Sequence, residues 1–268
     1  MKRSFFFLLI FVLTLSLLSS VVVGAKKDNS WTDLQKKGEF VLGLDDSFPP
    51  MGFRDANGQI VGFDIDVAKA VCDRLGINLK LQPINWDAKE QELNTKNIDC
   101  IWNGLTITPE RQRNLLFTKP YMDNRQVLVV RADSGLASLS ALSGKKLGLQ
   151  AGSSAKDALN SAPAFEATLA AVIEFDENMT ALMDLEMGGL DVVLMDEIVA
   201  RYYIQQRAKN FSVLNEALSH EEYGIGFRKN DRQLMEKFQK TLEAMAKDGT
   251  LAAISEQWFG EDITVVAK

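Results

Sequence analysis

The feature that most constrains the fold of this chain is a regular alternation of short apolar runs with stretches of helical periodicity. The run FVLGL at 40–44 predicts a strand, and the apolar residues from Ile65 to Leu75 recur at helical spacing up to Gly76, where a helix can end. Asp64, just before that stripe, is expected to cap the helix. Strands that alternate with helices form mostly parallel sheets covered on both faces, so an α/β fold is predicted.

The same pattern continues along the chain. A hairpin is predicted to turn at Asn57 and Gly58. Further strands are predicted at 77–81, 98–103, 145–150, 171–175, 190–196 and 223–229. Further helices are predicted at 87–95, 197–206, 231–247 and 251–260; one more is predicted to begin at 152, and another to end at 189. The second half repeats the first with different loops and no low-complexity linker. Two α/β lobes are therefore predicted, with a crossing between them near 124–132.

The N-terminal segment has the pattern of a secretory signal. Lys2 and Arg3 precede an apolar run at 5–18, and small residues follow up to Ala25. This order predicts a signal peptide, residues 1–25, that is cleaved near Ala25. An uncleaved membrane anchor is the alternative, but the short apolar run and the small residues at its exit favour cleavage.

Charge and composition exclude several classes of function. Removal of residues 1–25 takes away two of the 30 basic residues and none of the 36 acidic ones, which leaves a net charge of -8. An acidic surface argues against nucleic acid and anionic membranes as partners. With two cysteines, Cys72 and Cys100, and one histidine, His220, a structural zinc site is not expected. The cysteines can form a disulfide or remain two buried thiols, and His220 is expected to be solvated in a hinge or loop.

Polar residues follow the predicted strands, where open parallel sheets bind their ligands. In the segment WNGLTITPER, Thr108 can cap a helix that begins at Pro109, with Arg111 one turn in. A helix N-terminus beside a guanidinium group is suited to bind a carboxylate. Gly104 allows a ligand to approach the backbone, and Thr106 adds a hydroxyl group. An ordinary capped helix with a solvated arginine is the alternative.

Other strand ends offer complementary groups. Asp196 ends the run VVLMD, where it could bind an ammonium group or merely cap the next helix. Ser153 and Ser154, at a predicted helix start, could bind a carboxylate or only cap their helix. Asp45 could accept hydrogen bonds from a basic or amide group, or cap a turn.

Two aromatic residues are candidates for the walls of a ligand pocket. Phe48 and Trp86 could enclose the aliphatic or cationic part of a ligand side chain. Packing in the core is the alternative for each.

Taken together, several stretches of the chain resemble the periplasmic polar amino-acid-binding proteins of ABC transporters, the bacterial extracellular solute-binding proteins of family 3. The resemblance runs from about Phe40 to Gly260 and is carried by GLDDSFPPMGF, GFDIDVAKAV, IDCIWNGLTITPERQRNLLFTKPY, LSGKKLGLQAGSS, GGLDVVLMDE, YGIGFRK and DGTLAAISEQWFG. It implies a two-lobed periplasmic binding protein fold of type II with two hinge strands. Lobe 1 would comprise 26–121 and 224–268, and lobe 2 would comprise 122–223.

The resemblance also implies roles for the candidate residues. Arg111 would bind the α-carboxylate of an amino acid, helped by Thr106 and the backbone around Ser153 and Ser154. Asp196 and the carbonyl group of Gly104 would hold the α-ammonium group.

The side chain of the amino acid would be held by a second set of residues. Phe48 and Trp86 would form aromatic walls, and Asp45 would contact the far end. Asn103 and Gln150 would occupy variable lining positions.

The function implied is capture of a polar or basic amino acid, such as glutamine, arginine or lysine, in the cleft between the lobes. The protein would be periplasmic, would deliver its ligand to a membrane-embedded ABC permease, and would be a monomer without cofactor or metal. An enzyme on the same fold, similar to cyclohexadienyl dehydratases, is the alternative, with Glu90 or Asp45 as the candidate acid or base.

Overall fold

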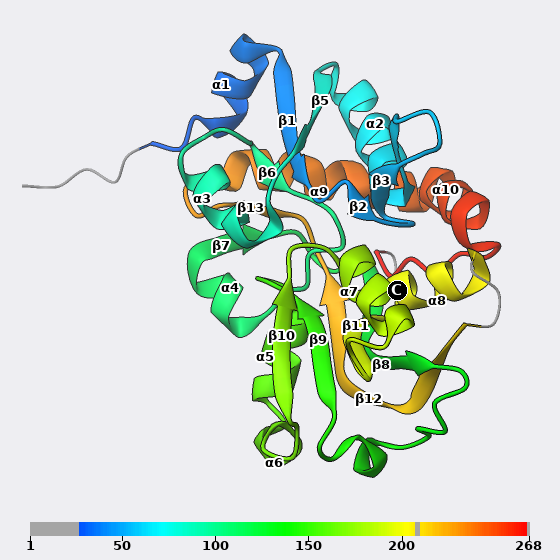
Figure 1. Cartoon of the computed structure of the whole chain (residues 1–268). Coiled ribbons are helices and arrows are strands. Elements are labelled where there is room, and N and C mark those ends of the chain that lie inside the picture. The colour runs from blue at the N-terminus through cyan, green and yellow to red at the C-terminus, as the bar shows by residue number, and fades with distance from the viewer. Residues whose placement is uncertain (1–26, 207–209, 267–268) are drawn as a thin grey trace, which may run out of the picture.

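The chain forms two lobes, which lie one above the other in Figure 1. This computed structural model describes residues 27–206 and 210–266, so the predicted signal peptide lies outside the described residues. Each lobe is built around a sheet of five strands. The two-lobed α/β fold predicted from the sequence is therefore confirmed.

The sheet of the first lobe combines strands from both ends of the chain. Its strands, in spatial order, are β5 (Asn78–Pro83), β1 (Glu39–Leu44), β6 (Cys100–Ile101), β13 (Gly226–Arg228) and β7 (Leu115–Phe117). β1 pairs in parallel with β5 and β6, whereas β13 is antiparallel to both of its neighbours. Four strands of five thus point in the same direction, and their carboxyl ends meet at one edge.

The sheet of the second lobe repeats this arrangement. Its strands, in spatial order, are β10 (Ala171–Phe175), β9 (Lys146–Gln150), β11 (Val192–Asp196), β8 (Met122–Arg131) and β12 (Phe211–Tyr223). β9 pairs in parallel with β10 and β11, and β8 is the antiparallel strand. In both lobes the first parallel strand lies between the second and the third, which places the loops after these strands at the facing edges of the lobes.

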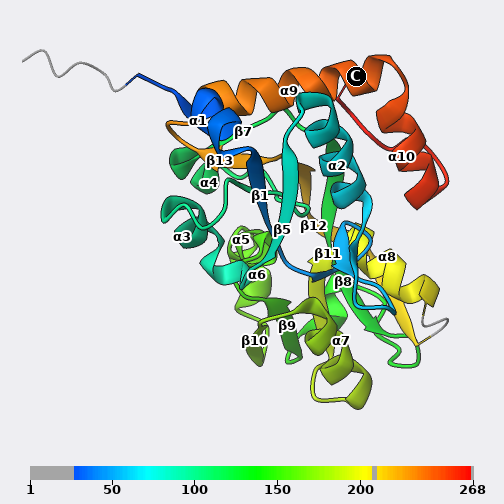
Figure 2. The ribbon, with the colours of Figure 1, turned by 90° about the horizontal axis from the view of Figure 1, so that it is seen from above.

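Helices cover both faces of the first sheet because alternate residues of β1 point to opposite sides. Phe40, Leu42 and Leu44 are buried in one hydrophobic cluster, and Val41 is buried in another. The helices of this lobe are α1 (Ser30–Lys37), α2 (Phe63–Leu75), α3 (Lys89–Asn94), α4 (Pro109–Asn114), α9 (Arg232–Lys247) and α10 (Thr250–Phe259). Figure 2 shows α9 and α10 beside α2, with α3 and α4 on the other side of β1.

The second sheet is covered in the same way. Leu147 and Leu149 of β9 lie in a cluster with the first two helices of the lobe, and Val193 and Met195 of β11 lie in the cluster on the other face. The helices are α5 (Ser154–Asn160), α6 (Pro163–Glu166), α7 (Asn178–Met187) and α8 (Glu197–Gln206). The helical turns η1 (Trp86–Ala88) and η2 (Leu139–Leu142), and a small sheet of β2 (Ser47–Phe48), β3 (Gly52–Arg54) and β4 (Ile60–Val61), complete the fold.

Two antiparallel strands, β8 and β12, carry the chain between the lobes. Met122 lies opposite Tyr223, where both strands reach the first lobe. The C-terminal tail reaches the same place, where Thr264 bridges to Met122. His220, expected in a hinge or loop, is exposed on β12. The lobe boundaries at 121/122 and 223/224 stay a prediction.

Three local predictions differ from the structure. Asp64 does not cap α2: the cap residue is Gly62, no side chain bonds the first turn, and the Asp64 carboxyl is buried. The strand predicted at 98–103 is paired only at Cys100–Ile101, because the chain then leaves the sheet. The helix predicted at 87–95 is shorter and follows a helical turn that begins at Trp86.

Both cysteines are free thiols buried in one hydrophobic cluster, which decides between the two alternatives left open by the sequence. Burial raises the pKa of Cys72 to about 12 and that of Cys100 well above its ordinary value. Within the described residues, no helix is long and apolar enough to cross a bilayer.

Because thiolates are the reactive form, we expect neither Cys72 nor Cys100 to react with a disulfide reagent at pH 8 in the folded protein. Unfolding in guanidinium without reductant should release both thiols, which a colorimetric assay counts. Fewer than two reactive thiols after unfolding would contradict the structure.

Candidate functional site

Nine of the eleven predicted site residues line one small cavity between the lobes. The first lobe contributes five and the second lobe four: Phe48, Trp86, Gly104, Thr106, Arg111, Gln150, Ser153, Ser154 and Asp196. The other two, Asp45 and Asn103, are buried nearby without lining the cavity. These residues lie at the carboxyl ends of parallel strands or in the segments that follow them, as the topology of the two sheets requires.

Arg111 provides a buried positive charge. Thr108 accepts a hydrogen bond from the amide of Arg111, which holds the first turn of α4 as predicted. The guanidinium group donates to the carbonyl oxygens of Thr106, at 3.0 Å, and Gly152, at 3.1 Å. It forms no ion pair with a described residue, and burial lowers its pKa. A buried cation whose partners are all neutral can still bind an anion.

A second cation lies beside Arg111. Lys89 donates to the same Gly152 carbonyl oxygen, at 2.7 Å, and to that of Trp86, at 3.1 Å. Its ammonium group also lies 5.2 Å from the centre of the Trp86 ring. Burial and the nearby charge of Arg111 lower the pKa of Lys89 to about 7. This end of the cavity is therefore electropositive, and Lys89 is a residue that the sequence did not single out.

Asp196 provides the opposite charge. Its Oδ1 accepts from the amide of Asn124 and from the hydroxyl of Tyr223, each at 2.7 Å, rather than from the start of α8. Only 4% of the residue is exposed. Burial, together with the charge of Glu221, raises the pKa of Asp196 to about 7. No described cation pairs with it, so the carboxylate is available to a ligand.

Glu221 connects the lobes at the hinge and was not predicted as a site residue. One of its oxygens, Oε2, accepts from the hydroxyls of Thr106, at 3.0 Å, and Ser154, at 3.1 Å. It also accepts from the amides of Gln126 and Asn124 on β8. The sequence signal that could have pointed to Glu221 is its position two residues before Tyr223, which puts Glu221 and Tyr223 on one face of β12.

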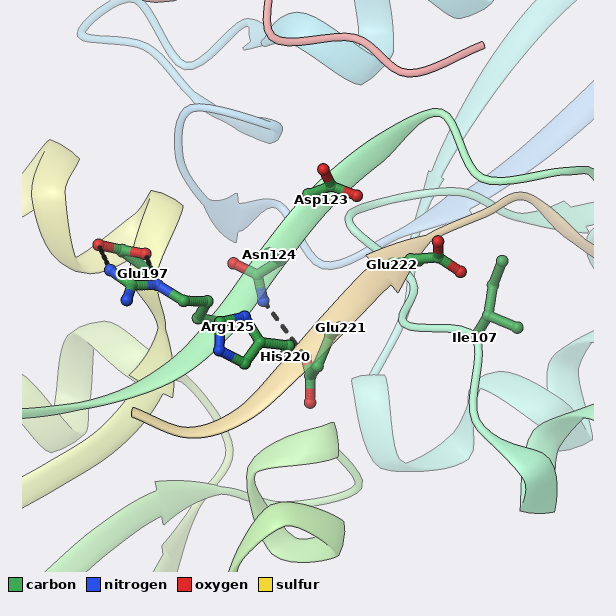
Figure 3. Close-up of a pocket in the computed structure, with 8 residues that line it drawn as sticks. All are labelled: Ile107, Asp123, Asn124, Arg125, Glu197, His220, Glu221 and Glu222. Carbon is green, nitrogen blue, oxygen red and sulfur yellow. Dashed lines mark hydrogen bonds and ion pairs between the residues drawn. The ribbon is translucent and has the colours of Figure 1, made fainter. Parts of the chain in front are cut away.

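A wider pocket lies along the hinge strands, and Figure 3 shows Glu221 and Asn124 in it. Arg125 of this pocket is paired with Glu197, at 2.6 Å. His220 is exposed there, as expected of a solvated histidine. The charged side chains of this wider pocket thus partly pair with one another, whereas Arg111 and Asp196 do not.

A second carboxylate lies beside the cavity, behind Gln150. Gln150 lines the cavity and donates to Asp45 Oδ2 at 2.7 Å and to the Asp176 carbonyl at 3.0 Å, while Asn178 donates to its Oε1 at 3.0 Å. Asp45 also accepts from the amide and hydroxyl of Ser47, so it holds a turn as well. Burial raises the pKa of Asp45, and no described cation pairs with it.

The remaining predicted residues are placed as follows. Phe48 and Trp86 are nearly buried, and a Cβ atom at Gly104 would lie 2.8 Å from the Phe48 ring. Ser153 precedes α5, but its hydroxyl donates to the Gln150 carbonyl instead of capping the helix. The side-chain amide of Asn103 is buried and has no hydrogen-bond partner among the described residues.

Comparisons with known proteins give the family of this chain. Residues 40–261 match the model of the bacterial extracellular solute-binding proteins, family 3. The chain belongs to this family.

Curated relatives in Escherichia coli K12 are named as amino-acid-binding proteins. The L-cystine-binding protein TcyJ is 31% identical over 233 residues, which cover 86% of this chain and 86% of the relative. The putative ABC transporter arginine-binding protein 2 is 32% identical over 218 residues, 80% of this chain and 87% of the relative.

A solved structure shows the same fold. It is an ABC uptake transporter substrate-binding protein from Streptococcus pneumoniae with bound histidine. It is 36% identical to this family 3 protein, with a TM-score of 0.87, and the match covers 90% of this chain and 100% of that one.

The unpaired charge of Asp196 leads to a prediction about the ligand-free protein. Its folded pKa of about 7 lies above the ordinary value of 3.8, so this carboxyl lowers stability increasingly as pH rises from 3.8 to 7; the effect is full above pH 7 and absent below 3.8. We expect Asp196→Asn to raise the free energy of unfolding at pH 8 by about 1 kcal/mol or more, and by less at pH 5.

Chemical denaturation at both pH values measures this difference. Asp133→Asn is the control, because the Asp133 side chain is 88% exposed. A variant that is destabilised at pH 8, or stabilised equally at both pH values, would contradict the assignment of a buried, uncompensated carboxylate.

Proposed function

We propose that this protein captures a free amino acid in the cavity between its lobes and delivers it to an ABC permease. The supporting observation is that Arg111 and Asp196 line the same cavity with opposite charges and neutral partners only. A zwitterion satisfies both charges at once, whereas a neutral molecule or a simple anion leaves at least one of them unpaired.

The main-chain groups of the ligand are assigned by charge. Arg111 binds the α-carboxylate, helped by Thr106 and the backbone around Ser153 and Ser154. Asp196 and the carbonyl oxygen of Gly104 bind the α-ammonium group. Each charged group of the ligand thereby exchanges water for a preformed partner.

The side chain of the ligand is polar or basic, as in glutamine, arginine or lysine. Phe48 and Trp86 form its aromatic walls, and Asp45, a carboxylate without a cation, lies behind Gln150 at the far end. Both N–H groups of Gln150 are taken by Asp45 and Asp176, so this end offers mainly acceptors. A side chain that ends in hydrogen-bond donors is complementary to such a pocket. Two relatives are named for cystine and arginine, and the solved structure contains bound histidine, so the ligand class varies within the family.

Ligand entry requires the lobes to separate, because side chains meet across the cavity. Gln150 contacts Asp45, Thr106 contacts Ser154, and Lys89 contacts Gly152. The lobes, 26–121 with 224–268 and 122–223, open about the hinge strands β8 and β12. Closure around the ligand brings together the surface that the permease recognises. The protein acts in the periplasm as a monomer after its signal peptide is cleaved near Ala25.

We expect Arg111→Ala and Asp196→Ala each to weaken amino-acid binding about a hundredfold or more, because each leaves a ligand charge buried and unpaired. The ligand is first identified by thermal shift against the twenty amino acids, ornithine, citrulline and cystine, since binding to the folded state raises the melting temperature. Titration calorimetry then measures the two variants.

Arg113→Ala is the matched control, because Arg113 lies on the same short helix but is exposed. It should bind like the parent protein, and all variants should keep the parent circular dichroism spectrum. Unchanged binding in both site variants would refute the assignment of the two charges.

We infer that the protein is a binding protein and not an enzyme, because the two charges of the cavity are arranged for a zwitterion. Incubation with prephenate or arogenate tests this. Formation of phenylpyruvate or phenylalanine would favour a cyclohexadienyl dehydratase instead.

A further inference from the structure

Asp64 is a completely buried carboxylate that the proposed function leaves unexplained. It is 0% exposed, and its Oδ2 accepts from the amide of Gly104, at 2.8 Å, and from the hydroxyl of Tyr121, at 3.0 Å. Both donors are neutral, no described cation pairs with it, and burial raises its pKa to about 7. A buried carboxylate in such surroundings destabilises the fold, so a role in function can account for its presence.

The partner of Asp64 lies in the loop that forms the cavity. β6 ends at Ile101, and the chain then turns through Gly104, whose φ is 58°. This conformation favours glycine, and a Cβ atom at this position would also lie 2.8 Å from the Phe48 ring. Having left the sheet, the amide of Gly104 has no strand partner, and its hydrogen bond goes to Asp64 instead. Asp64 therefore restrains the peptide on the amino side of Gly104, and with it the direction of the carbonyl group that follows.

A pair of tyrosines places this restraint next to Asp196. The rings of Tyr121 and Tyr223 are 6.3 Å apart, and the amide of Tyr121 donates to the carbonyl of Tyr223. The hydroxyl of Tyr121 bonds Asp64, and the hydroxyl of Tyr223 bonds Asp196. The two carboxylates thus flank one rigid aromatic unit, on the side of the cavity where the ligand ammonium group is expected.

We propose that Asp64 is a positioning residue for the ligand ammonium group: it holds the Gly104 backbone so that the Gly104 carbonyl and Asp196 face the same nitrogen atom. This inference rests on the proposed function. Asp64 does not touch the ligand, and it selects amino acids through the orientation of a neighbouring peptide. A purely structural acceptor in the core would instead affect all ligands of the cavity equally.

The first test separates these roles with two ligands. L-arginine and guanidinovalerate, which is L-arginine without its α-ammonium group, are titrated into the parent protein and Asp64→Asn. We expect the variant to bind L-arginine about tenfold more weakly or worse, and guanidinovalerate with less than about a twofold change. Asp66→Asn is the matched control, because Asp66 lies on the same turn of α2, does not line the cavity, and has its partners, Trp258 and Lys69, elsewhere.

Equal loss for both ligands, or no loss for L-arginine, would overturn the proposal. Failure of the parent protein to bind any amino acid would instead refute the proposed function. The second test is independent of that outcome because it needs no ligand.

The second test observes the Gly104 amide by nuclear magnetic resonance in the ligand-free protein. Its shift should titrate with a midpoint near 7 in the parent and not in Asp64→Asn. Should that variant fail to fold, Tyr121→Phe removes the other donor to the carboxylate and is expected to move the midpoint upward. A Gly104 amide that does not titrate in the parent protein, or titrates unchanged in the variants, would overturn the proposal.

Discussion

The constraint on which this protein depends is the burial of opposite charges without partners of their own. Arg111 in the first lobe and Asp196 in the second are both nearly buried, and both are bonded only to neutral groups. Each charge lowers the stability of the ligand-free protein, because desolvation is not offset by a counter-charge. The proposed selectivity depends on the same property, since a molecule with both charges at the right separation would relieve both.

The topology of the sheets brings these charges together. In each lobe the first parallel strand lies between the second and the third, and the residues that line the cavity lie at or after the carboxyl ends of these strands. Two such edges face each other because β8 and β12 carry the chain across as a pair. Glu221, on β12, bonds hydroxyl groups from both lobes, so the hinge and the cavity share one hydrogen-bond network.

Local sequence predicts much of this structure because strands, turns and helix ends depend on neighbouring residues. The hairpin at Asn57, the helix end at Gly76 and the cap at Thr108 are all found as predicted. Asp64 was wrongly expected to cap α2, because its real partners lie 40 and 57 residues further along the chain. Glu221 was missed for a similar reason: its hydrogen bonds come from β8, from the loop at Thr106 and from the start of α5.

The sequence by itself determined the α/β class, the family and most of the residues that line the cavity, since these follow from periodicity and from motifs at strand ends. Only the tertiary structure decided which side chains meet across the lobes. Gln150 reaches Asp45, two cations share the Gly152 carbonyl, and Cys72 and Cys100 remain thiols. These outcomes depend on distances between distant segments and on exclusion of water, which no local pattern of residues encodes.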